Sequence, residues 1–540
     1  MRPLKSSKNS DLKRLVVLFF ALTPIVVTSG CSGGKGSLSA GDNPSVVAET
    51  FFTSSDARAH IDFLASDSLM GRKTPSPGLT IAGDYIANQF KSYGLELING
   101  SYFQDFNLAK VRLGEQNFLK LKKDEKEKSY EIKTDFMPFE LTANKEARGN
   151  VVFVGYGITA PEYKYDDYAN TDVRGKIVFL LRHEPQENHP ASIFLGTKLT
   201  EHAQLRVKVQ NAIDHGAIAL LLASDPLNHP SMAPRGFPWP SLYKNIPEDA
   251  LPLTLASSEE SKIPVVHVGP SIIEDLLGSV DSLKSLESTI DSALHPHSFT
   301  LAARTVDVKT STSPLLVPTR NVVGLIRGSD PVLKNEVVVI GAHYDHVGTL
   351  ETHKQGEDYI YNGADDNASG TTGLLEIGKA FGQGHLKPKR SVIFIAFSGE
   401  ELGLLGSEAY VRAPLLPLKQ TVAMLNMDMI GRNGPDTVSI GGTTRSPELK
   451  EINERANKEV GLVLQYNIEQ YFARSDQASF ARRHIPILFY HTGEHPDYHK
   501  VSDNPDKIDT NKLLKIARLV FLTAWDVANS SSRPEYVEVK

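Results

Sequence analysis

The sequence has little of several residue types, and each shortage excludes a class of protein. A single cysteine among 540 residues excludes a framework of disulfide bonds. The formal net charge is only −6, from 58 basic and 64 acidic residues, so no broad positive surface for nucleic acid is expected. The composition, with 40% hydrophobic and 23% charged residues, is that of a globular protein. The length predicts two or three domains of about 100 to 200 residues each.

The amino-terminal segment is the one stretch expected to meet a membrane. Basic residues precede an apolar run from Leu15 to Val27, which is shorter than the about 20 residues that a transmembrane helix needs. Residues 1–30 are therefore predicted to be a secretory signal peptide. Cys31 follows small residues and begins a stretch rich in glycine and serine, so residues 31–50 are expected to form a flexible tether.

This arrangement resembles a bacterial lipoprotein signal. The resemblance implies that Cys31 is lipidated and anchors the chain to a membrane, in the periplasm or at the outer membrane. An ordinary signal peptide with an incidental cysteine, and hence a secreted protein, is the alternative.

A change of texture divides the rest of the chain. From about residue 146 to residue 300, short apolar strands such as Val151–Val154 and Lys176–Leu181 are separated by loops rich in proline. Leu205–Gly216 is the one good helical pattern within this module. The segment is therefore predicted to be a separate, mainly β domain inserted between two parts of another domain.

From Asn321 onward, strands alternate with helices. Four apolar runs are typical of strands buried on both faces: 322–326, 337–340, 392–397 and 422–425. Helical patterns follow at 369–381, 401–411, 447–460 and 511–528. The alternation predicts an α/β fold, in which a mixed, mostly parallel central sheet is sandwiched by helices. Ligands of such sheets bind at the carboxyl ends of the strands.

Acidic residues and histidine follow three of these strands. His343 comes after the second run, Glu400 and Glu401 after the third, and Asp428 after the fourth. Carboxylate and neutral imidazole together suit zinc. Carboxylates that end successive buried strands would repel one another unless a cation lies among them. The pattern therefore favours a dinuclear metal site.

Five motifs in order resemble peptidase family M28, a family of zinc aminopeptidases. The motifs are Gly341-Ala342-His343-Tyr344-Asp345, Gly363-Ala364-Asp365-Asp366-Asn367-Ala368-Ser369-Gly370, Ser398-Gly399-Glu400-Glu401-Leu402-Gly403, Asn426-Met427-Asp428-Met429-Ile430-Gly431 and Tyr498-His499. The module at 146–300 resembles the protease-associated (PA) domain that many relatives carry. The resemblance implies this division: 51–145 amino-terminal part of the catalytic domain, 146–300 PA domain, 301–530 metal-binding part, 531–540 tail.

The resemblance also implies the roles of individual residues. Asp366 would bridge two Zn²⁺ ions, with His343 and Asp428 on one ion and Glu401 and His499 on the other. The family pattern Gly-x-x-Asp selects Asp366 over its neighbour Asp365, and it implies a cis peptide between Asp366 and Asn367. Glu400 would be the general base, Tyr498 would donate to the oxyanion, and Asp345 would accept the ring N–H of His343. His346, His491 and His495 are expected to line the pocket rather than bind metal.

The implied function is that of a zinc-dependent exopeptidase, most simply an aminopeptidase that releases N-terminal residues from peptides. Related ligand sets also serve carboxypeptidases, dipeptidases and glutaminyl cyclases, and a non-catalytic, receptor-like binding protein is a further alternative. A carboxypeptidase needs a cation for the terminal carboxylate, for which Arg432 and Arg474 are candidates. Competent residues at all five ligand positions and at Glu400 favour catalysis.

Overall fold

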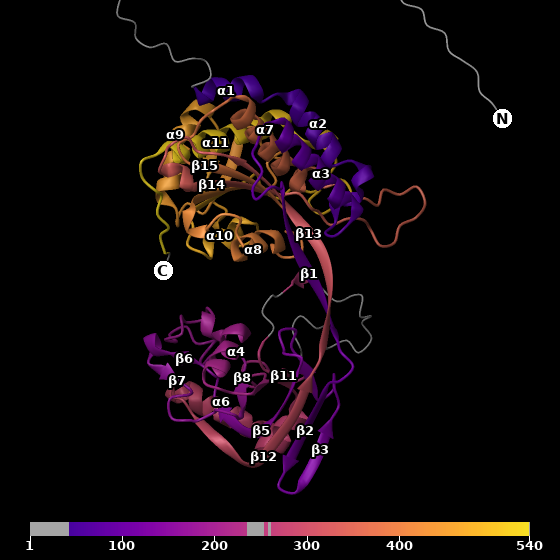
Figure 1. The fold of residues 1–540 in the computed structure, drawn as a ribbon, viewed down its shortest axis with the longest axis vertical. Helices are drawn as coiled ribbons and strands as arrows, with labels where there is room; N and C mark the ends of the chain where they lie inside the picture. The colour runs from indigo at the N-terminus through magenta and orange to yellow at the C-terminus, as the bar shows by residue number, and fades with distance from the viewer. Residues whose placement is uncertain (1–42, 235–252, 257–260, 539–540) are drawn as a thin grey trace, which may run out of the picture.

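The computed structural model describes residues 43–234, 253–256 and 261–538, and the predicted signal peptide and Cys31 lie outside these ranges. The described strands form two large sheets, which lie at opposite ends of the molecule in Figure 1, and one two-stranded sheet of β6 (Thr159–Ala160) and β7 (Tyr165–Asp166). Two long strands, β1 (Phe103–Leu113) and β13 (Thr312–Ile326), pair antiparallel and run from one end toward the other.

The nine-stranded sheet is mixed, and most of its parallel pairing is at its centre. Its order is β10 (Thr254–Leu255), β1, β13, β15 (Ser391–Phe397), β14 (Val337–His343), β16 (Thr421–Met427), β19 (Ile487–His491), β17 (Thr437–Gly441) and β18 (Val463–Gln465). Strands β15, β14, β16 and β19 are parallel to their neighbours within this group, whereas β1 and β13 on one side and β17 on the other join antiparallel. Four predicted strands are thus part of β13 to β16.

Helices cover both faces of this sheet (Figure 1). One face carries α1 (Pro44–Phe51), α2 (Ser54–Leu64), α3 (Pro77–Ser92), α7 (Gly370–Gln383), α9 (Pro447–Val460) and α11 (Thr510–Asn529). The other carries α8 (Leu405–Arg412) and α10 (Gln477–Ala481). Val338 and Ile340 of β14 pack on the first face, whereas Val337 and Val339 pack on the second. This alternation buries the strand on both sides, and the predicted α/β fold is confirmed.

The eight-stranded sheet has its own hydrophobic clusters. Its order is β3 (Lys126–Tyr130), β2 (Phe118–Lys123), β12 (Ser298–Thr310), β5 (Lys145–Val154), β8 (Ile177–Leu181), β9 (Ala219–Ala223), β11 (Val265–Val268) and β4 (Phe136–Pro138). The sheet therefore begins before residue 146, where the boundary of the inserted domain was expected. The reason is that Leu119 and Leu121 of the hairpin β2–β3 are buried against this sheet and pair with β12.

Three helical segments differ from the sequence prediction. The module holds not only α4 (Leu205–Asp214) but also α5 (Pro270–Leu277) and α6 (Val280–Ala293), whose apolar residues Ile273, Leu283 and Ile290 are buried. Helix α1 begins inside the segment 31–50 that was expected to be a tether, because Val47 and Ala48 are buried in the core of the first sheet.

None of the helices in the described part of the chain combines the length and apolar character that crossing a bilayer requires.

Candidate metal centre

The predicted donor residues follow the parallel strands at the centre of the nine-stranded sheet. His343 is the last residue of β14, Asp428 directly follows β16, and Glu400 and Glu401 come shortly after β15. The parallel register aligns His343 with Phe397, the last residue of β15. The strands therefore end at one edge of the sheet, where their following residues meet.

Two groups of donor atoms share Asp366, and together they are called the Asp366 centre below. In the first, His343 Nε2 lies 3.4 Å from Asp366 Oδ1 and 3.4 Å from Asp428 Oδ1. In the second, His499 Nε2 lies 3.0 Å from Asp366 Oδ2 and 3.2 Å from Glu401 Oε2. Within each group the donor atoms lie within 4.8 Å of one another, a spacing that could hold a metal ion. Asp366 offers one oxygen to each group.

Hydrogen bonds between side chains and main-chain atoms hold the loop of Asp366 in place. The Asp366-Asn367 peptide is cis, as the resemblance implies. Asn367 Nδ2 donates to the main-chain oxygen of Met427 at the end of β16 (3.0 Å), and Asp503 Oδ2 accepts from the main-chain N–H of Asp366 (3.2 Å). Gly363 has a φ of 58°, and a Cβ there would collide with the main-chain oxygen of Asp366. The loop is thereby tied both to β16 and to the segment that carries His499.

The competing carboxylate, Asp365, points elsewhere. Its Oδ1 accepts from the main-chain N–H of Gly431 (2.7 Å), and its Oδ2 lies 3.3 Å from His495 Nε2. Asp365 belongs to neither donor group. The geometry therefore favours Asp366 as the shared carboxylate.

Asp345 contacts His343 differently from the prediction. His343 Nδ1 lies 3.2 Å from the main-chain oxygen of Asp345 but 3.7 Å from its Oδ1, so the hydrogen bond is to the main chain. The carboxylate is turned toward another loop. Its Oδ1 accepts from the main-chain N–H of Glu400 (3.2 Å), and its Oδ2 accepts from the hydroxyl of Thr74 (3.0 Å). Asp345 thus positions Glu400 as well as His343.

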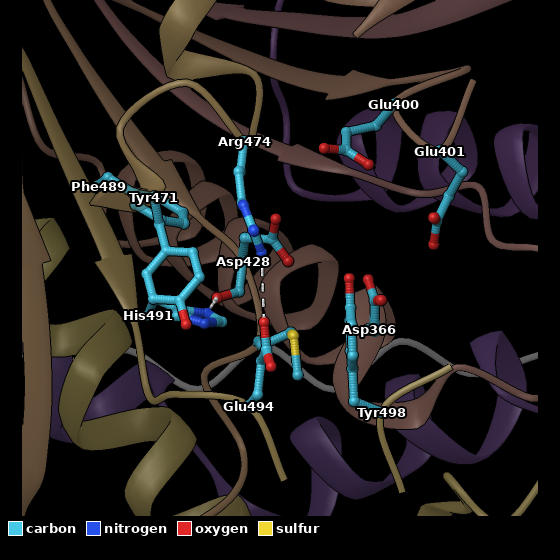
Figure 2. A pocket seen from close by; sticks show the side chains of 11 residues that line it. Asp366, Glu400, Glu401, Asp428, Tyr471, Arg474, Phe489, His491, Glu494 and Tyr498 are labelled. Atoms are coloured by element: carbon cyan, nitrogen blue, oxygen red, sulfur yellow. Dashed lines mark hydrogen bonds and ion pairs between the residues drawn. The ribbon is translucent and has the colours of Figure 1, made fainter. Parts of the chain in front are cut away.

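Glu400 and Glu401 lie in a turn, not in the helix predicted from residue 401. Helix α8 begins only at Leu405, because Gly399 and Leu404 both have left-handed backbones, with φ of 73° and 64°. The turn between them lets both glutamates reach the pocket, as Figure 2 shows. Glu400 Oε2 lies 3.9 Å from His343 Nε2, and Glu400 is in neither donor group.

The three histidines expected to line the pocket have three different positions. His491 does line it, and its Nδ1 bonds to the main-chain oxygen of Asp428 (2.7 Å). His346 joins the second donor group, with Nδ1 2.7 Å from Glu401 Oε1. His495 is not among the lining residues and pairs with Asp365 behind the pocket. Sequence spacing alone could not separate these positions, because all three follow or precede a motif residue closely.

The carboxylates and imidazoles of the centre shift one another's pKa. Burial opposes the charged form of His343, but Glu400 and Asp428 outweigh it and raise the His343 pKa well above its ordinary value. Burial raises the pKa of Glu400 well above its ordinary value, and Asp428 and Glu401 add to the effect. Burial likewise disfavours ionised Asp366, yet hydrogen bonds with His343 and His499 lower its pKa well below the ordinary value. This concentration of buried negative charge favours a cation at the centre.

A pocket opens beside these groups (Figure 2). Its walls combine the acidic groups with Tyr498 and with an apolar side made by Met429, Phe489 and Tyr471. Arg474 also lines it and lies 3.4 Å from Glu494, a second lining residue. Arg432 is not a lining residue and pairs with Asp497 (2.9 Å).

Sequence reasoning missed several residues that support the centre. Asp503 and Thr74 act on it through hydrogen bonds, and neither lies in a motif used for the prediction. Asp476 precedes α10 but makes no side-chain cap. It is fully buried, neither of its oxygens has a hydrogen-bond partner among the described residues, and burial raises its pKa to about 7.

Part of the carboxyl-terminal region matches a known family. Residues 321–524 match the model of peptidase family M28. A probable leucine aminopeptidase from Arthroderma otae is 30% identical over 211 residues, which are 38% of this chain and 57% of the relative. A probable zinc metalloprotease from Pyrenophora tritici-repentis is 25% identical over 263 residues, which are 40% of this chain and 59% of the relative. The chain thus spans little more than half the length of these relatives.

Solved structures also resemble the chain. An aminopeptidase from Aneurinibacillus sp. strain AM-1 is 21% identical, with a TM-score of 0.44, over 92% of this chain and 98% of that chain.

Proposed function

Residues 321–524 belong to peptidase family M28, and from this premise we propose that the protein is a zinc-dependent exopeptidase, specifically an aminopeptidase that removes N-terminal residues from peptides. The observation that carries the proposal is the sharing of Asp366 between two donor groups beside a pocket. A catalytic metal site needs metal donors and an adjacent space for the substrate. The two donor groups and the pocket supply these two requirements.

The donors fit two zinc ions. Imidazole nitrogen and carboxylate oxygen are the ligands zinc takes in catalytic sites, and Asp428 Oδ1 is a buried oxygen with no hydrogen-bond partner among the described residues. His343, Asp366 and Asp428 would hold one ion, and Asp366, Glu401 and His499 the other. Bound in this way, zinc supplies Lewis acidity, which lowers the pKa of a water and polarises the peptide carbonyl. His346 orients Glu401 through its Nδ1 hydrogen bond.

Glu400 is the general base in this proposal. It lines the pocket without belonging to either donor group, so its carboxylate is free to receive a proton at Oε. Burial raises its pKa well above the ordinary value, which makes Glu400 a stronger base than an exposed glutamate. The side chain therefore takes a proton from the attacking water and delivers it to the leaving amine. Asp345 fixes the main chain of Glu400 for this transfer.

The pocket walls orient the peptide. Tyr498 lines the pocket next to Asp366, and its ring stacks on His499 with centroids 4.1 Å apart, so its hydroxyl is placed to donate to the carbonyl oxygen (Figure 2). Met429, Phe489 and Tyr471 form an apolar wall for the side chain of the first residue. The acidic groups favour a free α-amine. Arg474, the candidate for a carboxypeptidase, faces Glu494, which offsets its charge.

Hydrolysis of matched free and N-acetylated peptides tests the proposal. The purified chain should cleave only the free peptides, lose activity on treatment with a chelator and regain it with zinc. Cleavage that tolerates acetylation but fails on C-terminal amides would identify a carboxypeptidase. Failure to cleave any peptide with zinc bound would contradict the exopeptidase proposal and leave the cyclase and receptor alternatives.

Three further parts of the proposal concern the whole chain. The eight-stranded sheet would be a PA domain inserted into the peptidase domain, with its start moved to about residue 118. The composition of residues 1–30 supports a signal peptide, a lipidated Cys31 and an extracytoplasmic location. Incorporation of labelled palmitate into the wild-type chain but not into Cys31→Ser tests the lipidation, and equal labelling would contradict it.

A further inference from the structure

A third group of metal-donor side chains lies on the eight-stranded sheet, outside residues 321–524 that match the family. Strands β8 and β9 are parallel neighbours, and Leu181 pairs with Ala223 at their carboxyl ends. His183 and Asp225 each follow two residues after these partners. The two loops therefore leave the sheet at one edge, which is the place where parallel sheets build ligand sites.

Each loop contributes an imidazole and a carboxylate at a spacing of four residues. His183 and Glu187 come from the first loop, and Asp225 and His229 come from the second. The main-chain N–H of His229 donates to the main-chain oxygen of Asp225 (2.8 Å), which closes one helical turn and brings the two side chains to the same side. These four residues are called the Asp225 cluster below.

The donor atoms converge. His183 Nδ1 lies 2.6 Å from Glu187 Oε2 and 3.5 Å from Asp225 Oδ1. His229 Nε2 lies 2.7 Å from Glu187 Oε1 and 3.7 Å from Asp225 Oδ2. The four residues each offer one atom within 4.8 Å of all the others. Donors on a tetrahedral zinc ion are about 3.3 Å apart, since the zinc–donor distances are about 2.0 Å, and the observed separations lie on both sides of this value.

Several of these atoms lack a hydrogen bond although they are buried. Asp225 is fully buried, and neither of its oxygens has a hydrogen-bond partner among the described residues. The same holds for His183 Nδ1 and Glu187 Oε2, although they lie only 2.6 Å apart. This combination of short distances and missing hydrogen bonds is expected when the lone pairs of these atoms point toward a common centre, where a metal ion would lie, and not toward one another. An ionised carboxylate buried in this way is costly unless a cation compensates it.

The surroundings offer the cluster no lysine or arginine among the described residues. Glu287 is also fully buried near Asp225, with Oε1 unpartnered among the described residues. The buried side-chain nitrogen of Lys208 bonds instead to the main-chain oxygen of Tyr156. The described ion pairs of Asp225 and Glu187 are therefore with His183 and His229 alone.

We propose that His183, Glu187, Asp225 and His229 form a further binding site for a divalent metal ion. The types of donor in this site favour zinc. Two imidazoles favour zinc over calcium or magnesium, which prefer oxygen ligands. Four protein donors complete a tetrahedral shell, so the site is of the closed, structural kind, and it joins the loops after β8 and β9. The side chain of His229 is 40% exposed and provides the route by which metal enters.

Metal content measured on matched variants tests the site. The full chain is stripped with a chelator, dialysed against zinc and analysed by mass spectrometry for zinc per chain. Asp225→Asn and His229→Gln should each hold one equivalent less than wild type, irrespective of how many ions the Asp366 centre holds. His202→Gln is the control, because it breaks a histidine–glutamate pair of 2.6 Å in the same sheet unit but outside the cluster. This control should keep the wild-type zinc content.

A second measurement needs no variant. Diethyl pyrocarbonate modifies accessible imidazoles, and zinc should protect His229 from it several-fold, while the exposed His297 reacts equally with and without zinc in the same digest. Equal zinc content in wild type and both folded variants would overturn the proposal, as would unprotected His229. The cluster would then be a set of histidine–carboxylate ion pairs. Hydrolysis of peptides by Asp225→Asn should match wild type, which separates this site from the proposed catalytic one.

Discussion

The Asp366 centre and the Asp225 cluster arise from the same structural feature, yet they are built for different tasks. Both collect imidazoles and carboxylates from loops at the carboxyl ends of neighbouring parallel strands. In the Asp366 centre, one carboxylate belongs to two donor groups, and Glu400 lies beside them in the lining of a pocket. In the second, four residues each offer one atom to one group. A catalytic metal ion requires an open coordination position and a nearby acid that is not a ligand, whereas a structural ion requires a complete set of protein ligands.

The largest expected effect comes from removing the shared carboxylate. Asp366→Asn should lower kcat/KM by more than about 1,000-fold, because the substitution weakens both donor groups at once. Zinc content should fall with activity. Asp365→Asn is the matched control, since an amide oxygen at this position still accepts the hydrogen bond of Gly431. If Asp365→Asn proved the more damaging of the two, the assignment of the shared carboxylate would be wrong.

Adjacent glutamates should separate metal binding from proton transfer. Glu400→Gln is expected to lower kcat by about 100- to 10,000-fold, which is the usual contribution of general acid–base catalysis, with zinc retained. Glu401→Gln should instead lose zinc, because Glu401 belongs to a donor group and Glu400 does not. Steady-state kinetics and zinc analysis of the two variants test this. Retention of full activity by Glu400→Gln would exclude the proposed base.

Much of the Asp366 centre could be predicted from the sequence, because apolar runs locate the strands and the residues that follow the strands are its donors. Apolar runs identified β13 to β16, and residues just after three of them supplied His343, Glu400 and Asp428. The support of the centre could not be predicted in the same way. Asp503 reaches the main chain of Asp366 across more than a hundred residues of sequence, and no local pattern signals such a contact.

The Asp225 cluster on the eight-stranded sheet could not be predicted from the sequence. The apolar run Lys176–Leu181 predicted β8, but nothing in the sequence of a strand gives its neighbours in a sheet. Only their parallel pairing brings His183 close to Asp225. The histidine–carboxylate spacing of four residues in each loop was the available signal, and alone it is common in structures without metal.

An intermediate effect is expected from residues that position the Asp366 centre without joining it. Asp503→Ala should lower kcat/KM by about 10- to 100-fold, the usual cost of losing a partner behind a metal ligand. The loss arises because Asp503 Oδ2 accepts hydrogen bonds from the main-chain N–H groups of both Asp365 and Asp366, and alanine leaves them without this acceptor. Asp497→Ala, which removes a carboxylate that pairs with Arg432 and Lys507 outside the pocket lining, is the control. Kinetics that show no difference between the two would contradict a positioning role for Asp503.

The smallest effect on catalysis and a distinct effect on stability should follow from the Asp225 cluster. Zinc at about 100 times its dissociation constant stabilises a folded site by about 2.7 kcal/mol, so it should raise the melting temperature of the eight-stranded sheet unit by several degrees. Asp225→Asn should abolish this rise while changing kcat/KM by less than about twofold, because the cluster and the pocket share no residue. Calorimetry of Glu400→Gln with and without zinc supplies the control, since its Asp225 cluster is intact. A zinc-dependent rise in the melting temperature of the eight-stranded sheet unit that survives Asp225→Asn would contradict metal binding by the cluster.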